Sequence, residues 1–354
     1  MSVAQRVATV AFDVVDPQHV DQVTPRAVGL AVPEPDLAEQ PARLHHQGLV
    51  AGAASTVEQL LGEIRFWHGE PYRARRHLDD VLRVYDVERH RGHALRYGHD
   101  PSVVAQGYLA LVAWISGSPD EAQLRARAVV DFARERAHPF SLSIALFFAA
   151  WVSQLRREPA RARDLGEALV AVATEQGFPE WLGWGEFVQG WALTEEGQLD
   201  EGIAAMERGC VAATGARSNF NSAARACLAA TYIRAGRATD ALAIVDTECA
   251  VLEETGARAF EAELHRVGGE ALVSCEGPSH AAEGRLRRAV EVARRRGGPA
   301  LKLRAATSLA RFWTSTGDPT GARDLLGPTY QRFKEGLDTA DLVEARTLLD
   351  ALGA

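Results

Sequence analysis

The sequence contains very little lysine, and it lacks the short motifs that mark common catalytic sites. Only Lys302 and Lys334 accompany the arginines among 39 basic residues. Neither lysine follows a glycine-rich loop, and a P-loop needs such a lysine to reach the phosphates of a nucleotide, so ATPase chemistry of that kind is excluded. No GxSxG, HExxH or GxGxxG pattern occurs either. We therefore expect a protein that is not an enzyme and that holds no cofactor and no metal.

Cysteine is also scarce, and long apolar runs are absent. The four cysteines lie 17, 22 and 26 residues apart, so there is no CxxC pair, and the pattern predicts small, buried, reduced side chains. No stretch approaches the ~20 apolar residues that span a bilayer, and the first residues show no secretion signal. With a net charge of −8, the chain lacks the basic balance typical of nucleic-acid binding. These absences predict a cytoplasmic protein with no membrane or nucleic-acid partner.

What the sequence does contain is a turn that recurs between two amphipathic stretches. The turns begin at Gly69, Gly117, Arg157, Gly197, Gly236, Gly277 and Gly317. Five of the six intervals lie within one residue of 40, and the longer first interval includes an inserted connection over residues 86–100. Glycine at the end of one helix can adopt the left-handed conformation, and proline two residues later, present at four turns, can open the next helix. The pattern predicts about seven helix pairs.

Small residues flank each turn at fixed distances. Alanine or glycine lies five residues after every turn start, and another lies seven residues before it in all repeats except the sixth, where Gly269 is displaced by one position. Two antiparallel helices joined by a short turn pack closely only where small residues meet. One pair cannot bury its apolar face alone, so neighbouring pairs must stack. We therefore predict an all-α, right-handed solenoid, a tetratricopeptide-like superhelix.

The two ends of the chain differ from the repeats. Residues 1–48 contain five prolines and no sustained helical period, which predicts an irregular or disordered extension. Residues 49–354 are then expected to form the solenoid. Residues 339–352 are amphipathic and have Thr339 as a candidate N-cap, so they are expected to cap the stack as a last helix.

Several blocks of the repeat region resemble a known family. The strings are HPFSLSIALFFAAWVSQLRREPARAR (138–163), ATEQGFPEWLGWGEFVQGWAL (173–193), EAELHRVGGEAL (261–272), LRAATSLARFW (303–313) and LDTADLVEARTLLDAL (337–352). Over about residues 55–354 the chain resembles the C-terminal tetratricopeptide-like repeat region of signal-transduction ATPases, many of which carry a class III adenylate or guanylate cyclase domain.

The resemblance implies a non-catalytic interaction or sensor module in signal transduction. Such a module binds a protein or a small effector and regulates an ATPase or cyclase partner. The ATPase and cyclase parts are absent from this sequence. A truncated remnant of a larger regulator, without independent activity, is therefore the alternative.

The first helix of each pair is expected to line the concave side of the superhelix, where solenoids usually bind their partners. Helical spacing predicts an aromatic half-groove formed by Trp114, Phe147, Trp151, Trp184, Phe187 and Trp191. It predicts a charged half-groove formed by Glu263, Arg266, Glu270, Arg304 and Arg311. Aromatic rings offer flat, rigid contact area, and arginines offer paired donors. The alternative is that the rings pack successive repeats together and that the charges satisfy one another across helices.

Two further clusters of side chains could bind a ligand. His90, His93, His99 and Asp100 could bind zinc, but a bare HxxH in a loop lacks the organised ligands of a structural site, so a solvated connection is favoured. A metal-dependent enzyme that uses the His90–Asp100 region stays a weaker alternative. The basic run over residues 285–296 could bind a polyanion, although a solvated outer helix face fits an acidic chain better.

Overall fold

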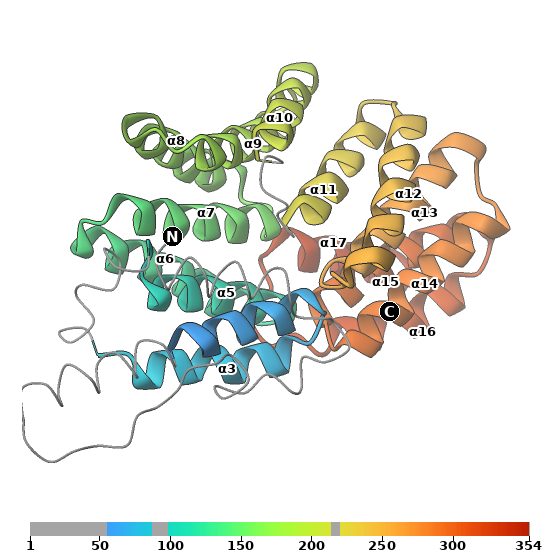
Figure 1. Ribbon diagram of the computed structural model, residues 1–354. Coiled ribbons are helices and arrows are strands. Elements are labelled where there is room, and N and C mark those ends of the chain that lie inside the picture. Colours follow the sequence, from blue (N-terminus) through green and yellow to red (C-terminus); the bar gives the residue numbers. More distant parts are fainter. Residues whose placement is uncertain (1–54, 87–97, 214–219, 354) are drawn as a thin grey trace, which may run out of the picture.

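The structure is a computed structural model that describes residues 55–86, 98–213 and 220–353. These residues form antiparallel helix pairs followed by one single helix, and no strand occurs among them. The pairs are residues 55–67 with α3 (Pro71–Val84), α5 (Pro101–Ile115) with α6 (Pro119–Arg136), α7 (Pro139–Leu155) with α8 (Pro159–Gln176), α9 (Pro179–Glu195) with α10 (Leu199–Ala213), α11 (Phe220–Arg234) with α12 (Ala238–Thr255), α13 (Glu261–Glu276) with α14 (His280–Arg296), and α15 (Pro299–Thr316) with α16 (Pro319–Tyr330). Helix α17 (Ala340–Ala351) ends the stack (Figure 1). The predicted all-α solenoid of about seven helix pairs with a capping helix is confirmed.

The turns within the pairs have the backbone that the sequence predicts. All six turn glycines have a positive φ, between 73° and 94°, and Arg157 has a φ of 61° at the same position of the third pair. Pro71, Pro119, Pro159 and Pro319 each occupy the first helical position of the second helix, where the missing N–H is not needed. Glycine fits this left-handed backbone because it has no Cβ, so Arg157 is the exception that needs a reason.

The small residues meet where the two helices of a pair cross. A Cβ added to Gly190 of α9 would lie 2.6 Å from the carbonyl oxygen of Gly202 on α10, which leaves no room for any side chain. The expected close approach of helices is therefore confirmed at this pair.

The first helices form an inner layer and the second helices an outer layer. Helix α7 buries 13 of its 17 residues, whereas α8 buries four of its 18. Within the inner layer, α5 packs on α7, α7 on α9, α11 on α13, α13 on α15, and α15 on α17. A helix covered on both sides needs apolar residues around most of its circumference, which explains the long apolar run in α7.

The superhelix closes on itself, so its first three turns contact its last repeats. The backbone N–H groups of Arg258 and Ala259 donate to the carbonyl oxygen of Trp67, at 2.6 and 3.0 Å. The N–H of Gly336 donates to the Asp120 carboxylate at 2.9 Å. Figure 1 shows the blue-to-green half of the chain lying against the orange-to-red half along this contact. The concave side is thereby bordered by both halves of the chain.

Two sequence expectations fall partly or wholly outside this description. Residues 1–48 lie outside the described residues, as do His90 and His93.

Thr339 is the N-cap residue of α17, as expected, but its side chain makes no capping hydrogen bond. Within the described part of the chain, no helix combines the length and the apolar character that a bilayer span requires.

Candidate ligand-binding cavity

A cavity of about 480 Å³ lies at the centre of the closed superhelix. Its wall is built from the first helices α7, α9, α11, α13 and α15, from the turn after α7, and from α17. The volume falls within the range of sites that hold small ligands, which is about 300–1,000 Å³. The first helices therefore face the interior, as the sequence predicts, and helix α17 completes the wall.

Seven of the residues that the sequence places on the groove line this cavity. They are Trp151, Trp191, Glu263, Arg266, Glu270, Arg304 and Arg311. Phe260, which precedes α13, adds a third aromatic ring to the wall. The aromatic and charged sets thus meet in one cavity, with the rings contributed by α7 and α9 and the charges mainly by α13 and α15.

The other four expected groove residues do not line the cavity. Phe147, Trp184 and Phe187 are each 1% exposed, and Trp114 is 3% exposed beneath the Arg304 guanidinium, whose carbon lies 4.8 Å from the Trp114 ring centroid. Trp151 and Trp191 are similarly buried, at 2% and 4% exposed, but they border the cavity. Phe220, the first residue of α11, contributes to the burial of Phe147 and Trp184.

The Phe220 ring occupies the inner side of the aromatic half. It packs edge-on against Phe147 at 4.7 Å and against Trp151 at 5.4 Å between ring centroids, and it also contacts Trp184. For Phe147 and Trp184 the packing alternative therefore describes the structure, whereas Trp151 and Trp191 remain in the cavity wall.

A buried ion-pair network forms the floor of the cavity. The Arg266 guanidinium donates to both oxygens of Glu263, at 2.7 and 3.0 Å, and pairs with Glu270 at 2.7 Å. Ser308 Oγ donates to Glu270 at 2.6 Å. Burial alone would raise the pKa of Glu263, but Arg266 and Arg304 outweigh it and lower this pKa to about 2. Glu263 therefore stays ionised at any physiological pH, and its hydrogen bonds with Arg266 are made within the wall.

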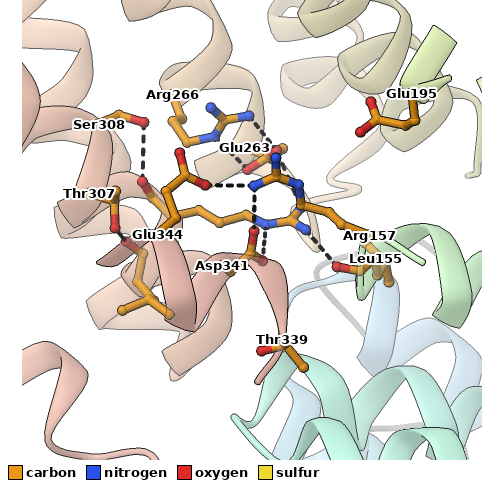
Figure 2. A network of polar contacts seen from close by, with 12 residues as sticks. Leu155, Arg157, Glu195, Glu263, Arg266, Thr307, Ser308, Thr339, Asp341 and Glu344 are labelled. Carbon is orange, nitrogen blue, oxygen red and sulfur yellow. Dashed lines mark hydrogen bonds and ion pairs between the residues drawn. The ribbon is translucent and has the colours of Figure 1, made fainter. Parts of the chain in front are cut away.

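Helix α17 joins this network through two carboxylates. Arg304 donates to Asp341 at 2.7 Å and to the carbonyl oxygen of Leu155 at 2.6 Å (Figure 2). Arg157 donates to Glu344 at 2.6 Å and reaches Asp341 at 3.5 Å, and Arg311 also donates to Glu344. Three separate segments, the turn after α7, α15 and α17, are therefore joined by arginine–carboxylate contacts.

Sequence reasoning missed Arg157, Asp341 and Glu344. A signal for Arg157 is present in the repeat alignment, because it is the only residue other than glycine at the seven turn starts. Asp341 and Glu344 lie three residues apart and therefore share one face of α17. Their approach to Arg157 could not be read from the sequence, since it depends on closure of the superhelix.

The cavity wall balances its charges and contains one unused donor. Five arginines face five carboxylates around it. The indole N–H of Trp151 is buried and has no hydrogen-bond partner among the described residues. Burial raises the pKa of the Cys227 thiol, which also lies in the wall, so this group stays protonated and unreactive.

Asp100 and part of the basic run on α14 make contacts that stabilise the fold. Asp100 is the N-cap of α5, where it accepts from Ser102 N at 2.9 Å, and Tyr85 donates to it at 2.5 Å. Among the described residues, no group of three or more histidine, cysteine or acidic side chains could hold a metal ion. On α14, Arg294 and Arg295 both pair with Glu291, at 2.9 and 2.7 Å, so part of that basic run is neutralised within its own helix.

The comparisons with known proteins agree with this architecture. No family model matches the chain. The uncharacterized protein R02095 of Rhizobium meliloti (strain 1021) is 26% identical over 230 residues, which are 64% of this chain and 22% of that protein. The chain therefore spans less than a quarter of the length of this relative.

Two solved structures show the same fold. A Rap protein complexed with Competence and Sporulation Factor has a TM-score of 0.53 and 12% identity, and the match covers 99% of this chain and 96% of that one. The apo form of RapI has a TM-score of 0.50 and 11% identity, over 84% and 99% of the two chains. The chain thus has a tetratricopeptide-like repeat fold.

Proposed function

We propose that the chain is a non-catalytic binding module that captures a short peptide segment in its central cavity. The single observation that carries this proposal is the cavity of about 480 Å³ whose wall combines aromatic rings with arginine–carboxylate pairs. Rigid rings give contact area at low entropic cost, and arginines give directional donors to carbonyl and carboxylate oxygens. A peptide offers the apolar, donor and acceptor groups that such a wall can satisfy.

Two similarities support a regulatory role for this binding. One solved protein of the same fold is complexed with Competence and Sporulation Factor, so the fold is compatible with capture of an effector. The repeat blocks resemble the sensor region of signal-transduction ATPases. We propose that the ligand-bound state of the cytoplasmic module is passed to an ATPase or cyclase-type partner, either on a separate chain or as part of a longer protein.

Blocking the cavity sterically tests the proposal without altering its charges. Ala230 of α11 lines the cavity, and Ala204 of α10 is exposed on the outer layer. Pentapeptides selected from a random library on the wild-type protein are measured by isothermal titration calorimetry against Ala230→Trp and, as a matched control, Ala204→Trp. We expect Ala230→Trp to weaken binding at least about 30-fold and Ala204→Trp to leave it unchanged.

The fold of both variants is checked by circular dichroism. If Ala230→Trp loses its fold, Ile233→Trp on the same wall takes its place. Equal binding by the cavity variant and the outer control would place the site elsewhere and refute the proposal. A library that yields no binding peptide would also refute it.

A further inference from the structure

Two accessible arginines of the cavity converge on one carboxylate. Arg157 and Arg311 both donate to Glu344, and their side chains are 40% and 47% exposed, against 32% for Glu344. Within the floor, the side chains of Arg266, Glu263 and Arg304 are less accessible, each only 13–14% exposed. A ligand that enters the cavity can therefore compete for Arg157 and Arg311 while the floor stays intact.

The accessible part of the network is balanced in charge. The side chain of Glu270 is 31% exposed, about as much as that of Glu344, so the accessible residues are three arginines, Arg157, Arg234 and Arg311, and three carboxylates, Glu195, Glu270 and Glu344. An anionic group on a ligand therefore has to take over arginines from one of these carboxylates.

Arg157 occupies its place at a conformational cost. Its φ of 61° is the left-handed conformation that the other six turn starts supply with glycine. A residue with a Cβ is disfavoured there, because the Cβ approaches the following carbonyl oxygen. Such strained residues concentrate at functional sites, where the side chain is needed. Here the side chain is the one that reaches across to α17.

We infer that the ligand carries a carboxylate that replaces Glu344 on Arg157 and Arg311, so that Glu344 is a competitor built into the cavity. This inference rests on the proposed function and specifies the chemistry of its ligand. The guanidinium groups match a carboxylate geometrically, since each can donate two parallel hydrogen bonds.

Release of Glu344 does not require α17 to leave its place. Leu342, Ala345 and Leu349 of this helix are buried in a hydrophobic cluster with α15 and α16, which holds the helix independently of the ion pairs. Only the half-exposed Glu344 side chain has to turn away. The exchange therefore amounts to one carboxylate replacing another on the same two cations.

Neutralising the internal competitor gives a test with a matched control. Glu344→Gln removes the competing charge, and Glu291→Gln removes a carboxylate that also binds two arginines but lies on α14 outside the cavity. The probes are pentapeptides made in four forms: with a free or an amidated C-terminus, and with Glu or Gln at one fixed position. Binding to the wild type and both variants is measured by calorimetry at low salt.

We expect the carboxylate-bearing forms to bind the wild type at least about tenfold more tightly than the amidated Gln form. Glu344→Gln should strengthen the binding of these forms a further ~3- to 10-fold relative to the amidated Gln form. Glu291→Gln should leave the binding of all four forms unchanged. The four forms also show whether the C-terminus or a side chain supplies the carboxylate.

Two results would overturn the inference. One is equal or tighter binding of the amidated Gln form to the wild type, and the other is weaker binding of the carboxylate forms by Glu344→Gln. Either result leaves the proposed function standing, because a peptide still binds in the cavity. Absence of binding by every form would instead refute the proposed function and this inference together.

Discussion

Arg157→Ala and Arg157→Gly both remove the arginine side chain, but we expect them to have different effects on stability. The backbone at residue 157 has a φ of 61°, which disfavours a residue with a Cβ relative to glycine. Glycine loses more conformational freedom on folding, which offsets part of this preference, so the net difference is roughly 1 kcal/mol in favour of glycine. The contacts of Arg157 with Glu344 and Asp341, at 2.6 and 3.5 Å on a 40% exposed side chain, contribute about 1 kcal/mol together.

Arg157→Ala keeps the backbone strain and loses the ion pairs, so we expect it to lower the free energy of unfolding by about 1 kcal/mol. Arg157→Gly loses the same ion pairs but relieves the strain, so its stability should lie within about 0.5 kcal/mol of the wild type. Urea unfolding followed by circular dichroism measures both variants.

Comparing the stabilities of Arg157→Ala and Arg157→Gly tests whether the backbone at residue 157 is left-handed. In an ordinary helix, alanine is favoured over glycine by up to about 1 kcal/mol. If Arg157→Ala were as stable as Arg157→Gly, or more stable, the backbone at this turn would not be left-handed. The argument that strain is retained for the sake of the cavity would then fail.

Two further predictions concern the helix packing and the pH dependence of stability. Gly190→Ala should destabilise the protein by about 1–3 kcal/mol, because the new Cβ would lie 2.6 Å from the backbone of Gly202. Gly284→Ala on α14 is the control, since its new Cβ would meet no atom within 4 Å, and it should stabilise the protein by up to about 1 kcal/mol. Urea unfolding measures both variants. Burial raises the pKa of Glu63 to about 7 from 4.5, so the folded state binds a proton more tightly and this residue should add about 1 kcal/mol of stability as the pH falls from 8 to 6. Glu63→Gln should lose that increment.

Each of these predictions has a result that contradicts it. A tolerated Gly190→Ala would mean that α9 and α10 are farther apart than described. For Glu63, the quantity to compare is the difference in unfolding free energy between wild type and Glu63→Gln across the pH range. Burial lowers the pKa values of the partly buried His68, His99 and His265, and these groups change stability with pH in the opposite direction. A difference that stays constant between pH 6 and 8 would show that the pKa of Glu63 is near its ordinary value.

The repeat architecture could be predicted because it is encoded locally. Turn glycines, opening prolines and small crossing residues recur at fixed spacing, and each acts within its own helix pair. The inward face of the first helices follows from the same spacing, which is why Glu263, Arg266 and Arg304 could be placed beside the cavity.

The closure of the superhelix could not be predicted in this way. It depends on a small rotation between successive repeats that accumulates along the array, and the length of a repeat does not fix that rotation. Two consequences were therefore missed. Phe220 contributes to the burial of Phe147 and Trp184, and helix α17 supplies Glu344 to the wall.

Photo-cross-linking tests the central claim, that the central cavity is the binding site, most directly. A peptide selected on the wild-type protein and carrying a benzoylphenylalanine is irradiated in complex with the full chain, and the adducts are located by mass spectrometry. The account predicts adducts on the inner helices α11, α13 and α15 and on α17. Adducts confined to the outer helices α8, α10, α12 or α14 would contradict it.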